Sequence, residues 1–155
     1  MTLGTATAQE YRKGDCVIST DRSRLDVEAI YNFLTECYWA KGIPRETVVR
    51  SIENSLCFGV YCERKQAGFA RVISDFATYA YIGDVFVLEP YRGRGFGKWL
   101  MECIVAHPEL QGLRRWALVT RDAHGLYAQF GFTPLQAPER WMERHDREVY
   151  ARSQP

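Results

Sequence analysis

The segment VFVLEPYRGRGFGK, residues 85–98, contains the strongest structural signal in this chain. An apolar strand ends at Pro90, alternating glycines follow, and an amphipathic helix begins inside the glycine loop. Backbone N–H groups at such a helix start lack helical partners and lie at the positive end of the helix dipole. Glycines let a ligand approach the backbone closely, and basic side chains add positive charge. The segment therefore predicts a loop that binds a phosphate or pyrophosphate; a glycine-rich turn that binds nothing is the alternative.

The spacing of the glycines excludes two common nucleotide-binding loops. A Walker A loop requires Ser or Thr after Gly-Lys, and here a tryptophan follows Lys98. The dinucleotide fingerprint requires G-x-G-x-x-G, whereas Gly93, Gly95 and Gly97 give G-x-G-x-G. The pattern present is Arg-x-x-Gly-x-Gly, which begins at Arg92 and follows a valine-rich strand. It resembles the acetyl-CoA pyrophosphate loop of the GNAT N-acetyltransferase superfamily.

Length and composition indicate one folded domain without a strong charge bias. The chain has 155 residues, of which 46% are hydrophobic and 14% aromatic. Its 20 basic residues nearly balance 19 acidic ones and form no long block, so nucleic-acid binding is disfavoured. The five cysteines lack Cys-x-x-Cys spacing, so we expect reduced core residues rather than a disulfide framework or a zinc site. They are Cys16, Cys37, Cys57, Cys62 and Cys103.

The first residues lack the apolar region of a signal peptide, and no apolar run reaches the length of a membrane span. We therefore expect a cytoplasmic protein with no membrane partner. Residues 1–15 are expected to be a loose leader, and residues 16–150 a single domain. No cluster of His, Cys or Asp has the spacing of metal ligands, so no metal site is predicted.

Hydrophobic periodicity predicts alternating strands and helices. Strands are expected at residues 16–20, 57–63, 68–74, 79–88, 116–119 and 140–149. Helices are expected from Asp26 as a cap to residue 37, and at residues 45–56, 96–107 and 123–130. The charged turn at residues 64–66 joins the second and third strands into a hairpin. This order predicts an α/β domain with a mixed central sheet and helices on both faces, and it is also the order of the GNAT fold.

A second motif, Leu-Tyr-x-x-x-Gly-Phe, occupies residues 126–132. In physical terms it is a short amphipathic helix that stops at Gly131, and Tyr127 taken alone is an ordinary half-buried aromatic residue. The motif is similar to the second signature of the same superfamily. That resemblance implies that Tyr127 lies near the thioester sulfur and is the general acid toward the departing CoA thiolate. A phenol with a pKa of about 10 and a thiol with a pKa of about 8.5 are close enough to share a proton.

Asp84 is the acidic residue in the middle of the apolar strand before the glycine loop. A buried carboxylate costs free energy unless it is paired or functional. The resemblance implies that this strand runs beside the pantetheine arm and the acetyl group. Three roles are open for Asp84: a base for the amine, directly or through water; an anchor for a cationic substrate; or the partner of an arginine such as Arg71. Because strand side chains alternate, Phe86 is expected to share its face, with Val85 and Val87 pointing away.

The resemblance also implies which residues hold acetyl-CoA. Main-chain groups of the strand would bind the pantetheine arm, amides of the loop would bind the pyrophosphate, and a strand N–H would stabilise the oxyanion. The expected cofactor-binding residues are Val85, Phe86, Val87, Arg92, Gly93, Arg94, Gly95, Phe96, Gly97, Lys98 and Asp122.

Aromatic side chains are the candidates for the acceptor pocket, because they suit a cation or a ring. They are Tyr38, Trp39, Tyr79 and Tyr81, with core packing as the alternative. His124 precedes Tyr127 by about one helical turn. It either binds CoA, tunes Tyr127 or lies on the surface.

Together the two motifs predict an acetyl-CoA-dependent N-acetyltransferase. We expect direct attack by a primary amine of a small molecule in a ternary complex, because neither motif contains a cysteine to carry an acyl group. A protein or peptide N-acetyltransferase is one alternative, and a non-catalytic acyl-CoA-binding sensor is another. The last expected strand and the Trp141-Met142 pair are candidates for a homodimer contact.

Overall fold

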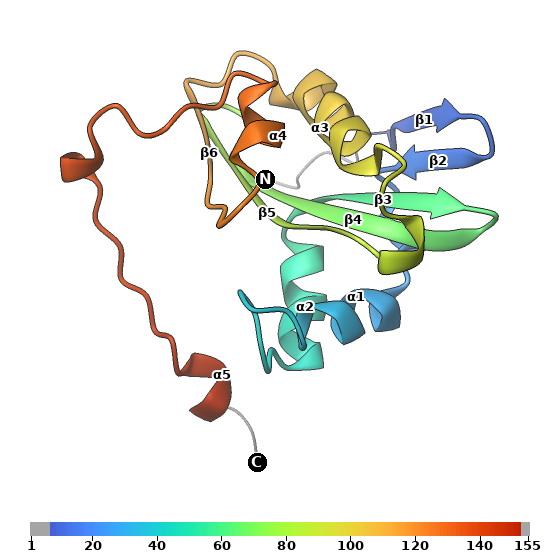
Figure 1. The fold of residues 1–155 in the computed structure, drawn as a ribbon, viewed down its shortest axis with the longest axis horizontal. Helices are drawn as coiled ribbons and strands as arrows, with labels where there is room; N and C mark the ends of the chain where they lie inside the picture. The colour runs from blue at the N-terminus through green and yellow to red at the C-terminus, as the bar shows by residue number, and fades with distance from the viewer. Residues whose placement is uncertain (1–6, 153–155) are drawn as a thin grey trace.

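The structure of the chain, a computed structural model, describes residues 7–152. Its centre is a six-stranded sheet in which the strands lie in chain order (Figure 1). The strands are β1 (Glu10–Lys13), β2 (Cys16–Ser19), β3 (Leu56–Cys62), β4 (Lys65–Ser74), β5 (Tyr79–Val87) and β6 (Arg115–Leu118). Neighbours from β1 to β5 are antiparallel, and β5 and β6 are parallel. The predicted mixed sheet is confirmed.

The helices lie on both faces of this sheet, as predicted. They are α1 (Val27–Leu34), α2 (Arg45–Glu53), α3 (Phe96–Ala106), α4 (His124–Ala128) and α5 (Val149–Arg152). Single 3-10 turns occur at Arg22–Arg24, Glu89–Tyr91, Pro108–Leu110 and Pro138–Arg140. Within residues 7–152, none of the helices is both long and apolar enough to cross a membrane.

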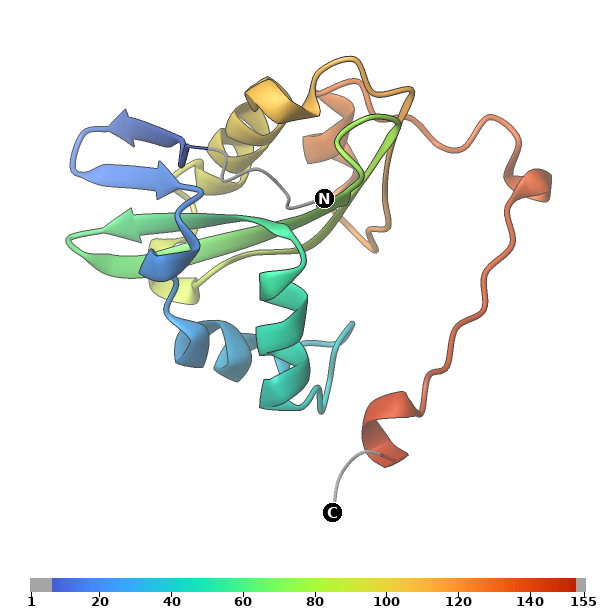
Figure 2. The same ribbon diagram turned by 180° about the vertical axis from the view of Figure 1, so that it is seen from behind.

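Helices α3 and α4 cover one face of the sheet, and α1 and α2 cover the other (Figures 1 and 2). A hydrophobic cluster lies on each side. On the face covered by α3 and α4, the buried side chains include Phe58 of β3 and Leu100 and Ile104 of α3. On the face covered by α1 and α2, they include Ile30 and Phe69. Burial of these side chains is the main favourable contribution to folding. We refer to the two clusters as the α3-side core and the α1-side core.

Helix α1 begins where the sequence predicts, because Asp26 caps it. An Asp26 carboxylate oxygen accepts the backbone N–H of Ala29 at 3.0 Å. The backbone N–H of Asp26 itself donates to Oε1 of Gln66 at 2.7 Å, so the cap is tied to β4. The helix start and the sheet are therefore positioned together.

The N-terminal region differs from the prediction of a loose leader. Residues 1–6 lie outside the described residues, but Glu10–Lys13 form β1, which pairs antiparallel with β2. Tyr11 packs against the α3-side core, whereas the other β1 side chains are exposed. Such a strand has little hydrophobic alternation and is held mainly by backbone pairing, so periodicity did not identify it.

The hairpin between β3 and β4 turns slightly earlier than predicted. Its turn is Glu63-Arg64, with φ of +51° and +67°, and β4 already begins at Lys65. Positive φ at both central residues is the geometry of the tight turns that suit twisted hairpins. Sequence did not reveal it because neither residue is a glycine, asparagine or aspartate.

The prediction that all cysteines are reduced is wrong for one pair. Cys16 and Cys62 form a disulfide between β2 and β3, with their Cα atoms 4.4 Å apart. They lie directly opposite each other in the strand register, which no local sequence pattern shows. The free cysteines among the described residues are Cys37, Cys57 and Cys103. Burial raises the pKa of Cys57 and of Cys103 to about 12, so both remain protonated core thiols.

The predicted last strand at residues 140–149 is also wrong. After α4 the chain leaves the β6 edge of the sheet as an extended arm and returns beneath the α1 side as α5 (Figure 1). All residues from 138 to 149 are exposed. The adjacent apolar pair Trp141-Met142 and the charged run after it lack the alternation of a half-buried strand, so no sheet pairing is favoured.

We expect Asp26→Ala to lower the free energy of unfolding by about 1 kcal/mol, because α1 loses its cap. Urea unfolding followed by circular dichroism measures this change. Glu143→Ala is the control, since it also removes one negative charge but lies in the exposed arm. Equal losses in the two variants would contradict the capping role.

Candidate active site

The site is built around the place where β5 and β6 diverge. The two strands pair only as far as Ile82 and Leu118. Beyond this point β5 continues to Val87, still paired with β4, while the chain after Leu118 turns toward α4. The divergence leaves the backbone of residues 83–87 with an open edge on the β6 side.

A β-bulge interrupts β5 at this edge. Gly83 and Phe86 of β5 lie opposite Arg71 and Phe69 of β4, so two β5 residues face a single β4 residue. One of the two is Asp84, whose φ is +52°, a region that aspartate adopts more readily than most residues. Bulges re-aim side chains. Here the bulge turns Asp84 toward the face that carries α1.

The predicted alternation of side chains after Asp84 is confirmed. Phe86 belongs to the α1-side core and stacks on Phe33, with ring centroids 4.0 Å apart. Val85 and Val87 pack against the α3-side core. Asp84 shares the face of Phe86, because its carboxylate is held by Trp39 and Arg71 on that side.

Backbone groups of Val85 and Val87 face the open edge of β5. The N–H of Leu88 donates to the carbonyl of Ala67 at 2.8 Å, so Leu88 faces the β4 side. Since backbone groups alternate along an antiparallel strand, those of Val85 and Val87 face the β6 side. The Val87 carbonyl accepts a hydrogen bond from Nε of Arg92 at 2.9 Å. This hydrogen bond holds Arg92, which precedes the glycines of the loop, at the end of β5.

The glycine loop enters α3 through left-handed backbone conformations. Gly93 has φ of +78° and Gly95, the N-cap of α3, has φ of +81°. No side chain caps this helix start, and within residues 7–152 no heavy atom lies within 4 Å of a Cβ built at either glycine. The first turn of α3 thus has neither a side-chain cap nor a side chain crowding these two glycines, which is what an anion site at a helix start requires.

Positive charge surrounds this helix start. The Arg94 guanidinium lies 5.0 Å from the Phe96 ring centroid, and the Lys13 ammonium lies 5.5 Å from that of Trp99. Lys98 is exposed in the first turn. A pocket of about 210 Å³ lies beside this helix start. Its lining residues are Lys13, Cys16, Arg94, Gly95, Phe96 and Trp99. Lys13 was absent from the predicted site, because β1 was not expected.

Tyr127 lies in α4 with 8% of its surface exposed, and belongs to the α3-side core against which Val85 and Val87 of β5 pack. Its ring packs edge-on against Phe132, with centroids 6.1 Å apart. Burial raises the pKa of Tyr127 above its ordinary value, and the Tyr38 hydroxyl nearby raises it further. The phenol therefore stays protonated at neutral pH, as a general acid must be.

Asp84 is half-buried and forms an ion pair. Nε of Arg71 donates to one carboxylate oxygen at 2.8 Å, and the Trp39 indole N–H donates to the other at 2.9 Å. Arg71 also donates to the Ser55 hydroxyl at 3.0 Å. Of the three roles left open for Asp84, the contact with Arg71 is the one seen directly in the structure.

The candidate acceptor-site aromatics gather on this same side of β5. Trp39 binds Asp84, and Tyr38 packs edge-on against Trp39 with ring centroids 5.1 Å apart. Burial raises the pKa of Tyr81, and the negative charge of Asp84 and then Tyr79 add to that effect. Trp39 thus contacts the Asp84 carboxylate directly and Tyr38 lies behind Trp39, while Tyr79 and Tyr81 lie further along β5.

Two further predicted residues lie at the surface. Asp122 is exposed and its carboxylate lies 3.6 Å from the Arg121 guanidinium. His124 is the exposed first residue of α4. Arg121, which sequence reasoning missed, stacks on Tyr38 with its guanidinium carbon 4.0 Å from the ring centroid. Its position just after a predicted strand was the available signal.

Comparisons with known proteins agree with this fold. The model of the acetyltransferase (GNAT) family matches residues 27–132. A candidate acetyltransferase of Gibberella zeae is 31% identical over 144 residues, which cover 78% of this chain and 80% of that protein. The crystal structure of a candidate GNAT acetyltransferase from Xanthomonas campestris pv. campestris is 52% identical, with a TM-score of 0.87 over 90% of this chain and 99% of that one.

A more distant structural neighbour shares the fold alone. It is a candidate acetyltransferase from Clostridium acetobutylicum, solved with acetyl-CoA, which is 14% identical with a TM-score of 0.61. The alignment covers 90% of this chain and 95% of that one. Fold and site together define an acetyltransferase. The chain belongs to the GNAT family, whose members use acetyl-CoA.

We expect Asp84→Asn to lower the free energy of unfolding by about 2–3 kcal/mol, because the largely buried Arg71 loses its counter-charge. Asparagine keeps the shape and tolerates the positive φ. A double-mutant cycle with Arg71→Met, measured by urea unfolding, tests the pairing. The double variant is expected to lose less than the sum of the two single losses. Additive losses would show that the ion pair contributes nothing.

Proposed function

We propose that this protein transfers the acetyl group of acetyl-CoA to a primary amine of a small molecule, by direct attack in a ternary complex. The observation that carries the proposal is the open edge of β5, which has the uncapped start of α3 at its end and Tyr127 beside it. This arrangement suits a thioester that carries a pyrophosphate. The pyrophosphate requires the N–H groups of a helix start, and the reacting thioester requires hydrogen-bond donors at a separate point.

The residues have distinct parts in binding the donor. The amides from Gly95 to Lys98, with Arg92 and Arg94 beside them, would bind the pyrophosphate. The backbone of Val85 and Val87 would pair with the pantetheine arm along the open edge, where one lone pair of the Val87 carbonyl already accepts from Arg92.

The chemical step needs one proton acceptor and one proton donor. The neutral amine attacks the acetyl carbon, a C–N bond forms, and the negative charge that develops on the carbonyl oxygen is stabilised by a backbone N–H near Val85. The C–S bond then breaks, and the Tyr127 hydroxyl gives its proton to the sulfur. The proton lost by the amine leaves through water, from which Tyr127 regains its own.

We assign Asp84 a positioning role. Both of its carboxylate oxygens already accept hydrogen bonds, from Arg71 and from Trp39. These contacts orient the Trp39 indole at the acceptor side of β5. The carboxylate is therefore engaged by the protein itself on both oxygens.

We expect Gly95→Val to reduce the affinity for acetyl-CoA at least about tenfold, because a branched side chain would project from the helix start where the pyrophosphate binds. Isothermal titration calorimetry measures this affinity. Gly112→Val is the matched control, since Gly112 has φ of +73° and a Cβ there also meets open space. Both variants are expected to lose similar stability, but only Gly95→Val should lose binding. Unchanged affinity would exclude the loop as the donor site.

We expect Tyr127→Phe to lower kcat by about 10–10⁴-fold with acetyl-CoA affinity intact, because the departing thiolate loses its acid. A variant with unchanged kcat would remove Tyr127 from this role.

The raised pKa of Tyr127 keeps the acid form populated to higher pH, so kcat of the unaltered protein should hold until pH exceeds about 10, the ordinary tyrosine value, and then fall.

A turnover screen with acetyl-CoA tests the acceptor class and the alternatives. Amino acids, polyamines, aminoglycosides and peptides are offered, and acetylated products are detected by mass spectrometry. Free cysteines make a thiol-reagent readout unsuitable. Acetylation of peptides alone would favour the protein or peptide acetyltransferase. Acetyl-CoA binding without any acetylated product would favour the sensor.

A further inference from the structure

The C-terminal arm, residues 133–152, has little buried surface. Within residues 138–152, every residue is exposed except Tyr150 of α5. The Tyr150 side chain packs against the α1-side core, and the Arg115 guanidinium of β6 lies over the Trp141 ring, 5.2 Å from its centroid. Of these two contacts, Tyr150 buries more of its side chain, and burial is the main source of stability.

Tyr150 reaches the side of β5 that carries the candidate acceptor site. Burial raises its pKa, the negative charge of Asp84 raises it further, and the positive charge of Arg71 lowers it. Its ring packs against the α1-side core, which also contains Phe86 from the β5 face that carries Asp84. The arm therefore places a phenol on this face of the sheet.

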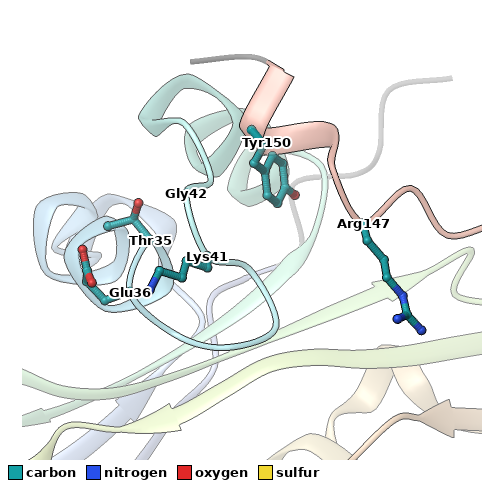
Figure 3. Close-up of a pocket in the computed structure, with 7 residues that line it drawn as sticks. Thr35, Glu36, Lys41, Gly42, Arg147 and Tyr150 are labelled. Atoms are coloured by element: carbon teal, nitrogen blue, oxygen red, sulfur yellow. The ribbon is translucent and has the colours of Figure 1, made fainter. Parts of the chain in front are cut away.

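A pocket of about 420 Å³ lies between α5 and the α1–α2 connection, residues 35–44 (Figure 3). Figure 3 shows Tyr150 and Arg147 of the arm on one side, and Glu36 and Lys41 of the connection on the other. Its lining residues are Thr35, Glu36, Lys41, Gly42, Arg147, Tyr150 and Ala151. This volume suits a small molecule but not a folded protein surface.

The α1–α2 connection links this pocket to the reacting centre. Its Trp39 donates to Asp84, and its Tyr38 ring stacks with Arg121, which lies just before the helix α4 that carries Tyr127. One short segment thus lines the pocket on one side and contacts the Asp84 and Tyr127 regions on the other.

We propose that Tyr150 is a specificity-determining residue of the acceptor site, and that the C-terminal arm forms the outer wall that restricts the acceptor to small amines. This inference rests on the proposed transfer to an amine, but it adds a residue that neither motif contains. The ring of Tyr150 lines the pocket on the side opposite Glu36.

Steady-state kinetics on the full chain test the inference, with spermidine, lysine and a lysine-containing hexapeptide as acceptors. Tyr150→Ala is expected to raise KM for the small amine at least about tenfold, leave KM for acetyl-CoA unchanged and shift kcat/KM toward the hexapeptide. Tyr150→Phe keeps the wall and should stay within about threefold of the unaltered chain. Val149→Ala, the control on the same helix, should change neither. Equal behaviour of Tyr150→Ala and Val149→Ala would overturn the proposal.

A binding measurement separates this inference from the proposed function. The full chain is labelled with 3-fluorotyrosine, the Tyr150 signal is assigned with Tyr150→Phe, and each amine is added in the presence of CoA. An amine that binds should move the Tyr150 signal together with that of Tyr38. Movement of the Tyr38 signal alone would overturn the role of Tyr150. Failure of the chain to bind acetyl-CoA would instead count against the proposed function.

Discussion

The divergence of β5 from β6 after Ile82 is the constraint that organises the candidate site. A strand inside a sheet has no backbone groups to offer a ligand, because both edges are paired. Here β5 stays paired with β4 but is free on its other side, and the bulge at Asp84 re-aims one side chain at that point. A strand that is held in the sheet on one side therefore presents a free hydrogen-bonding edge on the other, without the instability of a strand that is unpaired on both sides.

In the proposed function, the two faces of β5 receive different parts of the reaction. On one side α3 and α4 place the uncapped helix start and the Tyr127 phenol, which we propose serve the donor. On the other side, the α1–α2 connection places Trp39 on Asp84, and α5 packs Tyr150 against the same α1-side core. The donor side is built from regular elements packed on a large core, whereas the acceptor side is built from a connection and an arm. Such segments change more readily than a core, so the fold can keep its donor site while its acceptor varies.

Much of the fold was predictable because strong periodicity marks most of its elements. The stripe on α3, the cap at Asp26 and the continuous apolar run of β5 each have a local cause, and each was found at or near its predicted position. The failures have local causes too. β1 lacks apolar alternation, and the predicted last strand lies where exposed, charged residues form an arm.

Local sequence alone determined the candidate donor side of this protein. Glycines that permit positive φ at a helix start, and a tyrosine set before a glycine stop, act within a few residues of chain, so their spacing carries the information. Tertiary structure decided the Cys16–Cys62 disulfide, the pairing of Asp84 with Arg71 and the packing of Tyr150 against the α1-side core. The first two contacts follow from strand register, and the third follows from the path of an arm that has no hydrophobic periodicity. No short segment of sequence encodes these contacts, because each of them joins residues that only the packed sheet brings together.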